Sequence, residues 1–259
     1  MTEGIAGEIR RALAEDEFRV GYQPVLSLPE DRIVGAEALI RWQHPTDGLI
    51  GPSAFVHQAE QAGVIHDIGR WVLRRSCVDF ATWHKVGLSP GRVSVNLSPG
   101  QLDAGTVRDV ARVLGESDLP PAHLTLEITE SLVMDSPEQA IETFRDLRAL
   151  GIGIAIDDFG TGYSSLAYLR RLPTNVLKVD KVFVDHVPAN RYDAEILRHV
   201  IGMAHGVGLV VVAEGVETQE QLAFLRECGC DLVQGYLVGE PIPPRLYARK
   251  ILGAEPDDG

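Results

Sequence analysis

Short apolar segments recur along the chain, and stretches with helical periodicity lie between most of them. Several of these segments consist almost entirely of valine, isoleucine and leucine, which is typical of strands buried on both faces of a parallel sheet. The segments number eight and span residues 20–28, 32–40, 92–98, 124–130, 152–158, 176–184, 209–216 and 232–239. The pattern therefore predicts eight strands.

Three of the intervening stretches carry clear helix signals. Residues 136–151 and 218–229 each open on a hydroxyl side chain with a glutamine three positions later, the capping-box pattern, and each ends on a glycine. The apolar residues of the first of these stretches keep helical spacing. Residues 67–87 predict a longer helix that ends at Gly87.

The order of these elements predicts the fold. Strand and helix alternate almost to the end of the chain, which indicates a parallel α/β fold, and eight strands in 259 residues favour a closed TIM-like (β/α)₈ barrel. Only a short PEDR turn separates the first two strands, so we expect them to be antiparallel, a departure from the ideal barrel. We expect residues 1–259 to form one domain with a flexible tail at 253–259.

The charge balance limits the choice of ligand. Acidic residues outnumber basic residues 37 to 24, and the formal net charge is −13. Such a surface repels nucleic-acid backbones and anionic membranes, which argues against a protein that binds polymeric nucleic acid. A small phosphorylated ligand is compatible with this charge if positive charge is supplied locally.

Apolar run length and cysteine content indicate the compartment. No stretch approaches the roughly 18 apolar residues of a membrane-spanning helix, so no membrane segment is predicted. The three cysteines, Cys77, Cys228 and Cys230, are too few for a disulfide framework. Cys228 and Cys230 lack a second pair with which to bind a metal, so we interpret them as buried thiols. These features predict a cytoplasmic protein.

Polar side chains lie at or near the carboxyl ends of the predicted strands. All those ends meet at one rim of a parallel barrel, and that rim holds the active site of such folds. Any one of these residues alone is as readily interpreted as a solvated strand end, but six strands repeat the feature and a seventh carries an internal glutamate. The residues are Glu37, Asn96, Glu127, Asp157, Asp158, Lys178, Glu214 and Gln234.

The acidic members of this set predict a metal centre. Carboxylates crowded without a cation repel one another, and ligation by oxygen atoms alone favours Mg²⁺ or Mn²⁺ over zinc. Two such ions bridged by one carboxylate are the usual arrangement for phosphoryl hydrolysis. The predicted oxygen ligands are Glu37, Asn96, Glu127, Asp157 and Asp158.

Asp157 and Asp158 raise a geometric question, because neighbouring side chains on a regular strand point to opposite faces. Both can serve one site only where the strand ends and the backbone turns. Gly160 and Gly162 would permit that turn, because glycine tolerates positive φ. The alternative interpretation is an ordinary Asp-Gly turn.

Seven ordered motifs, together with an opening strand, resemble those of the EAL-domain phosphodiesterases. The resemblance runs from about Arg10 to about Pro244 and therefore covers nearly the whole chain. A lone Glu-Ala-Leu triplet would mean little, but seven motifs in order are highly specific. The motifs are EALIRW from residue 37, VNLS at 95–98, LEITES at 126–131, DDFGTGYSSL at 157–166, LKVD at 177–180, AEGVET at 213–218 and QGYLVG at 234–239, and YQPVLSL at 22–28 is similar to the family's opening strand.

The resemblance implies a modified TIM barrel with one antiparallel strand that linearises cyclic di-GMP to 5′-pGpG. It implies that one metal is held by Glu37, Asn96, Glu127 and Asp157. Asp157 would bridge to a second metal, with Asp158 on that side. Lys178 would orient the attacking water, although a salt bridge to Asp180 is an alternative role for it. Glu214 resembles the residue proposed as the general base.

Further residues match positions around the family's substrate and loop. Gln23, Leu39, Arg41, Asp180 and Gln234 match substrate-pocket positions, Glu130 matches a glutamate that steadies the loop after Asp158, and Glu217 matches a supporting acid. That loop and the following helix form much of the dimer contact in the family, so the resemblance implies a homodimer. Val238 and Glu240 depart from the family pattern near the substrate, but no expected metal ligand is missing.

Two other functions stay open at this point. A catalytically silent module that binds cyclic di-GMP and signals through a partner would share most of these motifs, although the complete set of acids favours catalysis. A TIM-barrel lyase or aldolase that uses Lys178 as a Schiff base is a weaker alternative. The chain is interpreted as either a stand-alone enzyme or one domain of a longer protein.

Overall fold

A computed structural model describes residues 2–135, 137–160 and 171–253. Its strands are β1 (Phe18–Ser27), β2 (Arg32–His44), β3 (Gly48–Ile50), β4 (Arg92–Leu97), β5 (Leu124–Thr129), β6 (Gly153–Phe159), β7 (Val176–Val179), β8 (Val210–Ala213) and β9 (Leu232–Val233). Its α-helices are α1 (Thr2–Ala14), α2 (Val56–Gln61), α3 (Ile65–Lys85), α4 (Ala104–Ser117), α5 (Glu130–Asp135), α6 (Pro137–Ala149), α8 (Lys181–Val184), α9 (Arg191–Gly206), α10 (Gln219–Glu227) and α11 (Pro244–Lys250).

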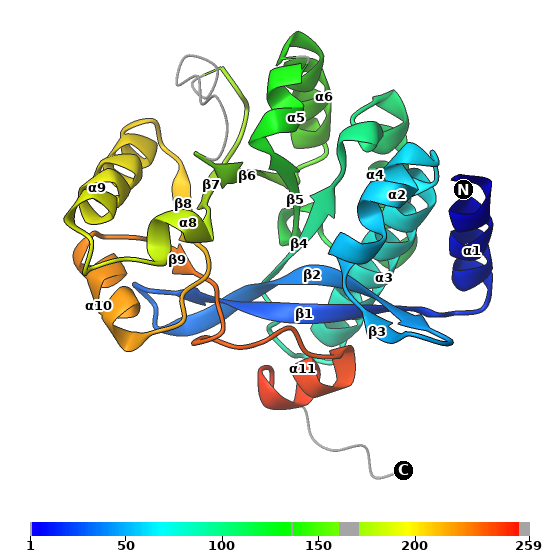
Figure 1. Ribbon diagram of the computed structural model, residues 1–259, viewed down its shortest axis with the longest axis horizontal. Helices are drawn as coiled ribbons and strands as arrows, with labels where there is room; N and C mark the ends of the chain where they lie inside the picture. The colour runs from blue at the N-terminus through cyan, green and yellow to red at the C-terminus, as the bar shows by residue number, and fades with distance from the viewer. Residues whose placement is uncertain (1, 136, 161–170, 254–259) are drawn as a thin grey trace.

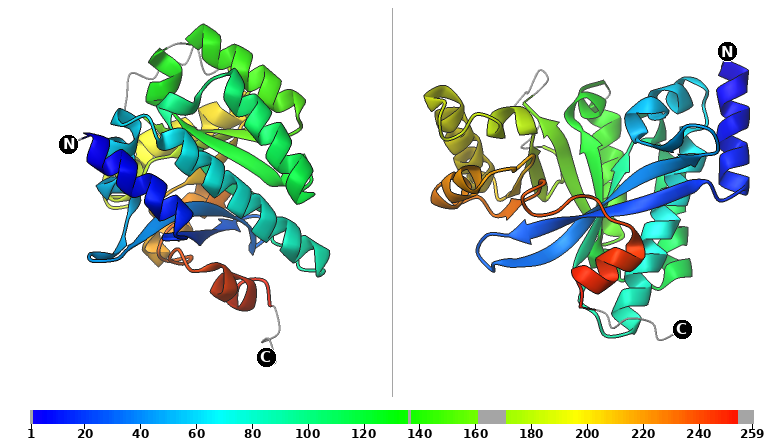
Figure 2. Two further views of the ribbon diagram at one scale, coloured as in Figure 1. Left: turned by 90° about the vertical axis from the view of Figure 1, so that its right-hand side faces the viewer. Right: turned by 60° about the horizontal axis from the view of Figure 1, so that its bottom comes forward.

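The sheet closes on itself into a barrel. Neighbouring strands follow the order β1-β9-β8-β7-β6-β5-β4-β2, and β2 pairs with β1 to complete the ring, while β3 extends β2 as a short hairpin. β1 runs antiparallel to both of its neighbours, and the other ring pairings are parallel. Helices surround the strands (Figures 1 and 2). The predicted modified (β/α)₈ barrel with one antiparallel strand is confirmed.

The predicted strand at 176–184 is too long. β7 ends at Val179, and α8 begins two residues later. The carboxylate of Asp180 accepts a hydrogen bond from the Val182 amide at 2.8 Å, so it caps the new helix. An aspartate in an extended conformation is a strong helix start, and here it outweighs the β preference of the valines and phenylalanine that follow.

The last two predicted strands are also shorter than expected. The segment at 209–216 contributes only β8, and the segment at 232–239 contributes only the two residues of β9. Most residues in the second halves of these segments form the loops that carry Glu214 and Gln234 over the barrel mouth. In contrast, β2 continues beyond the predicted end as far as His44.

The three predicted helices are present as α3, α6 and α10. The predicted capping box forms at α10, where Gln221 N donates to Thr218 Oγ1 and the Thr218 amide donates to Gln221 Oε1. On α6 the apolar side chains Ile141, Phe144 and Leu147 are buried against the barrel. Ser136, Gly162, Ser164 and all but the first residue of the expected flexible tail lie outside the described residues.

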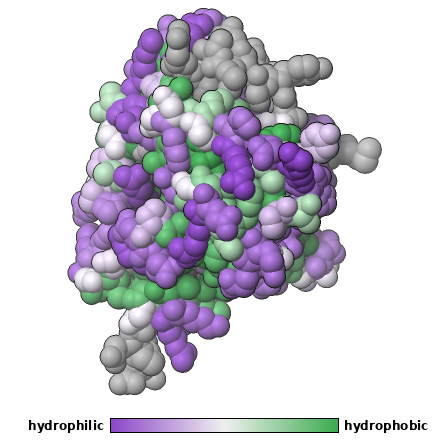
Figure 3. Space-filling view, turned by 90° about the vertical axis from the view of Figure 1, so that its left-hand side faces the viewer, coloured by the Kyte–Doolittle hydropathy of each residue, from purple (hydrophilic) through white to green (hydrophobic). Residues whose placement is uncertain are grey.

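The cysteines agree only in part with the interpretation from composition, because Cys228 is half-buried rather than buried. Cys77 and Cys230 are buried, and burial raises the pKa of each thiol to about 12. None of the three cysteines forms a disulfide. Within the described ranges, no helix combines the length and the apolar character that crossing a bilayer requires. On the side of α9 and α10 the surface is mainly hydrophilic, with smaller apolar areas between (Figure 3).

Candidate active site

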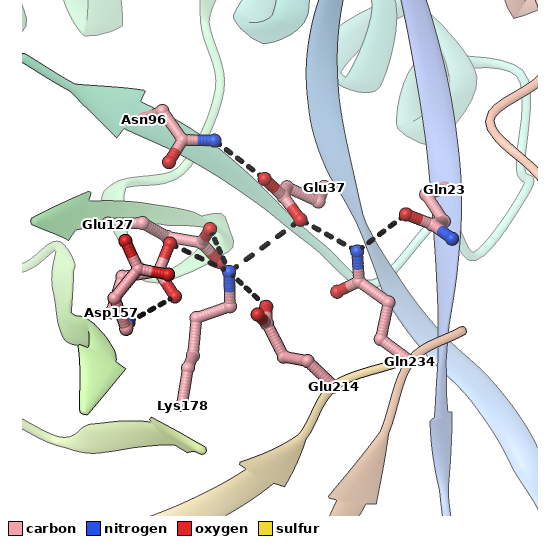
Figure 4. A network of polar contacts seen from close by, with 9 residues as sticks. Gln23, Glu37, Asn96, Glu127, Asp157, Lys178, Glu214 and Gln234 are labelled. Carbon is pink, nitrogen blue, oxygen red and sulfur yellow. Dashed lines mark hydrogen bonds and ion pairs between the residues drawn. The ribbon is translucent and has the colours of Figure 1, made fainter. Parts of the chain in front are cut away.

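The polar residues from the strand ends converge at the mouth of the barrel. Glu37 comes from β2, Glu127 from β5, Asp157 from β6 and Lys178 from β7, while Glu214 and Gln234 follow β8 and β9. Their side chains point toward one another across the mouth (Figure 4). We call Glu37, Glu127, Asp157, Asp158 and Glu214 the acidic cluster.

Lys178 lies at the centre of the acidic cluster. Its side chain is 2% exposed, and its Nζ lies 2.5 Å from Glu127, 2.6 Å from Glu214, 3.2 Å from Asp157 and 3.6 Å from Glu37 (Figure 4). These four carboxylates, rather than Asp180, are the ion-pair partners of Lys178 among the described residues. Burial disfavours the ammonium, but the carboxylates outweigh it and raise the pKa of Lys178 well above its usual value.

One ammonium does not neutralise the acidic cluster. Burial raises the pKa of Glu127 well above its usual value and raises that of Glu214 to about 7. Burial, followed by the charges of Asp157 and Asp180, also raises the pKa of Asp158. Repulsion between the carboxylates adds to the effect of burial at Glu127, Asp158 and Glu214, and one ammonium faces five carboxyl groups, a condition that favours binding of further cations.

Glu37 is the exception because its partners favour the carboxylate. Burial acts to raise its pKa, but Lys178, Gln234 and Asn96 together lower it below the usual value. Asn96 Nδ2 donates to Glu37 Oε1 and Gln234 Nε2 donates to Glu37 Oε2, each at 2.6 Å. Gln234 Nε2 also donates to Gln23 Oε1 at 2.9 Å, and Gln23 Nε2 donates to the Gly239 carbonyl at 3.1 Å. A chain of amides thus fixes Glu37 at the mouth.

The backbone turns at Asp158 itself, two residues before the first of the two glycines. Asp158 has a φ of 55°, Gly160 has a φ of 96°, and the β6–β7 register shifts between Ile156 and Phe159. Aspartate tolerates this left-handed conformation better than most residues, so the turn can begin before Gly160. As a result, carboxylate oxygens of Asp157, Asp158 and Glu214 lie within 4.8 Å of one another.

This arrangement fits a hard divalent cation. The gathered donors are carboxylate oxygens from the end of β6 and from the loop after β8, and such donors suit Mg²⁺ or Mn²⁺. Asn96 directs its amide nitrogen, rather than its oxygen, toward Glu37 (Figure 4). A ligand role for Asn96 would therefore use the other atom of its amide.

Most predicted substrate residues line one cavity beside the acidic cluster. This cavity, which we call the mouth cavity, has a volume of about 280 Å³. Its lining residues are Gln23, Glu37, Leu39, Lys181, Glu214, Gly215, Glu217, Gln234, Gly235 and Tyr236. Leu39 and Asn96 also line a larger, mostly apolar cavity of about 480 Å³ between β2 and helices α2 and α3. An apolar cavity therefore lies beside the acidic mouth of the barrel, and Leu39 lines both.

Arg41 lies elsewhere. It lines a separate cavity with Gln43, Trp71 and Pro241, and its Nη1 donates to the Ile40 carbonyl at 2.9 Å. The sequence match placed Arg41 with the substrate residues, but its guanidinium is not among the groups that line the mouth cavity.

The remaining predicted residues hold loops in place. Glu130, the first residue of α5, accepts a hydrogen bond from the Gly160 amide at 3.1 Å, at the start of the loop that follows Asp158. Glu217 pairs with Lys181, a residue that our sequence analysis did not single out. The sequence feature that could have pointed to Lys181 is its place directly after the LKVD motif, where a basic side chain follows the cap of α8.

The raised pKa of Glu214 predicts a pH-dependent stability. Without a divalent ion, the unfolded chain releases this proton near pH 4.5 and the folded protein keeps it to about pH 7. Stability therefore falls as pH rises between these values, by up to about 3 kcal/mol. Thermal melts in a chelator at pH 5 and pH 8 measure the loss, and Glu214→Gln, which cannot ionise, should show a smaller loss. Equal pH dependence in both proteins would contradict the assignment.

Fold and site together define a class: a modified TIM barrel with an acidic, oxygen-donor centre at the carboxyl ends of its strands. The family model described as "EAL domain" matches residues 6–241. The chain belongs to the EAL domain family.

Named relatives and solved structures agree with this membership. The chain is 48% identical over 237 residues to the cyclic di-GMP phosphodiesterase NbdA of Pseudomonas aeruginosa, covering 91% of this chain and 30% of the relative. It is 42% identical to MucR of the same organism, a bifunctional diguanylate cyclase and cyclic di-GMP phosphodiesterase, covering 91% of this chain and 35% of that protein. The MucR phosphodiesterase solved in complex with c-di-GMP superposes with a TM-score of 0.88 at 41% identity, covering 93% of this chain and 98% of that one. The chain spans about a third of the length of the curated relatives it matches.

Proposed function

We propose that this chain is a metal-dependent phosphodiesterase that hydrolyses cyclic di-GMP to linear 5′-pGpG. The observation that carries the proposal is the acidic cluster, in which five carboxyl groups from four segments gather at the mouth and four of them share the single ammonium of Lys178. The names of the relatives and the complex of the MucR phosphodiesterase supply the substrate. The mouth cavity and the larger cavity, which share Leu39 in their linings, offer room for a dinucleotide.

The proposed cofactor is a pair of Mg²⁺ or Mn²⁺ ions. Glu37, Asn96, Glu127 and Asp157 would hold one, and Asp157 with Asp158 would hold the other. Two such ions supply positive charge to a phosphodiester and make bound water more acidic. The fit rests on the donor chemistry of the acidic cluster and on the negative charge that Lys178 leaves uncompensated.

The remaining catalytic and positioning roles are proposed for the chain's own residues. Glu214 is proposed as the general base, because a carboxyl with a pKa of about 7 is well matched to taking a proton from water near neutral pH. Lys178, held by its carboxylates, would orient the attacking water. Gln234 and Gln23 would keep Glu37 in position through their amide chain, and Leu39 would line the space for the substrate.

The experiment is a turnover assay with the purified chain. We expect Mn²⁺ and cyclic di-GMP to yield pGpG on chromatography, and a chelator to stop the reaction. Glu214→Gln should slow the reaction by about 10²-fold or more while weakening binding far less, because it removes a proton acceptor used in the chemical step. Equal losses in reaction rate and in binding affinity would show that Glu214 binds the substrate instead.

The same assay separates the alternatives. Binding of cyclic di-GMP without turnover would support the silent receptor. The lyase or aldolase alternative needs a neutral amine at Lys178, but the carboxylates hold that amine protonated. Borohydride trapping with a carbonyl substrate is therefore expected to leave Lys178 unmodified.

We also propose that the chain acts as a cytoplasmic homodimer and that residues 1–259 form a single domain. The proposed dimer contact is the loop after Asp158 with the following helix, and most of that segment lies outside the described residues. Sedimentation of the purified chain measures the assembly state.

A further inference from the structure

The three carboxylates that lie closest together in the acidic cluster come from segments on either side of β7. Asp157 and Asp158 lie at the end of β6, Glu214 follows β8, and β7 pairs with both strands. Oxygen atoms of these three carboxylates lie within 4.8 Å of one another. The spacing of the two halves of this site therefore depends on what lies between them, at the end of β7.

The end of β7 is bonded to both halves, and α8 follows it directly. Val179, the last residue of β7, pairs with Phe159 of β6, and its carbonyl accepts a hydrogen bond from the Glu214 amide at 3.0 Å. α8 begins two residues later, and its Val184 is 0% exposed, which anchors this short helix on the core. The helix is thus fixed between the loops that follow β6 and β8.

Two side chains of α8 contact a glycine in each of these loops. Residues two positions apart on a helix point about 200° away from each other, so Lys181 and Phe183 face different neighbours. The Phe183 ring lies against Gly160, where a Cβ would be 2.6 Å from the ring atoms Cε2 and Cζ. The aliphatic stem of Lys181 lies against Gly215 in the same way. α8 therefore contacts both halves of the site from the strand between them.

The contact of Phe183 with Gly160 lies two residues from Asp158, where the backbone turns. Asp158 has a φ of 55°, a conformation that costs free energy in any residue but glycine and persists where the surroundings hold it. Gly160 is held by a hydrogen bond from its amide to Glu130 Oε2 at 3.1 Å and by the half-buried ring of Phe183. Glu130 is the support that the sequence predicts, whereas Phe183 received no role from its motif.

We propose that Phe183 is a positioning residue for the cation site. By packing on Gly160, its ring keeps the turn at Asp158, and with it the carboxylates of Asp157 and Asp158, in place beside Glu214. The described lining of the mouth cavity does not include Phe183, so its effect passes through the loop rather than through contact with the substrate. The inference rests on the proposed function and deepens it, because the groups that Phe183 positions are the proposed cation ligands.

Phe183→Ala tests the inference in the turnover assay. We expect the Mn²⁺ concentration that gives half-maximal turnover to rise about tenfold, because loss of a group that supports metal ligands weakens metal binding. At saturating Mn²⁺ the KM for cyclic di-GMP should change less than about twofold. Phe183→Leu, which refills part of the space, should restore part of the Mn²⁺ dependence. Val182→Ala is the matched control, because Val182 is on the same helix, is 55% exposed, and should change neither quantity.

Cation binding without substrate gives a second readout. Mn²⁺ titrated into the protein and followed by electron paramagnetic resonance should bind about tenfold more weakly to Phe183→Ala than to the unsubstituted chain. If Phe183 only fills space in the core, Phe183→Ala lowers the unfolding free energy in a chelator but leaves the Mn²⁺ affinity unchanged, and the inference is overturned. If Phe183→Ala does not fold, Phe183→Leu decides in the same way: weaker Mn²⁺ binding supports the role, and unchanged binding refutes it.

The two readouts separate this inference from the proposed function. Mn²⁺-dependent hydrolysis by the unsubstituted chain, together with unchanged Mn²⁺ affinity in the Phe183 variants, would refute the positioning role and leave the proposed function standing. Absence of hydrolysis in the unsubstituted chain would refute the proposed function. Weaker Mn²⁺ binding by the Phe183 variants would in that case still support the role of Phe183 at the cation site.

Discussion

We expect Asp157→Asn to lower turnover of cyclic di-GMP by about 10³-fold or more and to leave the fold intact. Asp157 is the proposed bridge between two cations, and an amide there loses the charge that a shared ligand needs. The side chain is buried, and its Oδ1 accepts the Asp158 amide at 2.9 Å, a bond that an asparagine oxygen can also accept. The substitution removes one negative charge from a cluster with excess negative charge. The unfolding free energy of the metal-free variant should therefore lie within about 1 kcal/mol of that of the unsubstituted protein.

Initial rates with Mn²⁺, together with chemical denaturation in a chelator, measure the two effects of Asp157→Asn. Asp118→Asn is the matched control: this aspartate is exposed and pairs with Lys85 on the surface. Retained turnover in Asp157→Asn would refute the bridging role. Lost turnover combined with a collapsed fold would show instead that Asp157 is needed for structure.

Lys178→Met is expected to have the largest effect on stability. In the metal-free protein it leaves buried carboxylates without their shared cation, which typically costs about 3–5 kcal/mol. Divalent ions should recover part of this loss, because they supply positive charge to the same oxygens. Activity should also fall severely, since the proposed orienting group for the water is absent.

Denaturation curves with a chelator and with Mg²⁺ measure the stability difference, and Lys85→Met provides the comparison. Lys85 also pairs with a carboxylate, at 3.0 Å, but both partners are exposed, so its loss should cost less than about 1 kcal/mol. Similar losses of unfolding free energy in Lys178→Met and Lys85→Met would show that the acidic cluster is stable without the Lys178 ammonium. A loss at Lys178 that Mg²⁺ does not reduce would argue against a cation site at these oxygens.

The site was predictable from sequence to the extent that it depends on strand ends. Glu127, Asp157 and Lys178 each lie at or near the end of an apolar segment, and a parallel barrel brings such ends together. The pairing of Lys178 was not predictable, because Asp180 is its near neighbour in sequence while its four partners lie 21 to 141 positions away. The structure instead gives Asp180 to the helix cap of α8.

Arg41 and Lys181 also show that sequence position alone does not predict which cavity a side chain lines. Arg41 is two positions from Leu39 on β2, and a sequence match places both in the substrate pocket. In the structure, however, Leu39 lines the mouth cavity and Arg41 lines a different cavity. Lys181 received no role from its motif and lines the mouth cavity because α8 begins where β7 ends. Which cavity a side chain enters depends on the helices and loops packed around its strand.

Local patterns along the chain were sufficient to establish the barrel, its antiparallel first strand and the chemical type of its centre. Alternation of strand and helix, the length of a turn and the polarity of strand ends are properties of short segments, and each restricts the fold on its own. The ion pairs of Lys178, the left-handed backbone at Asp158 and the raised pKa of Glu214 arise only in the folded chain. They depend on burial and on charges brought together from distant segments, which no single segment contains.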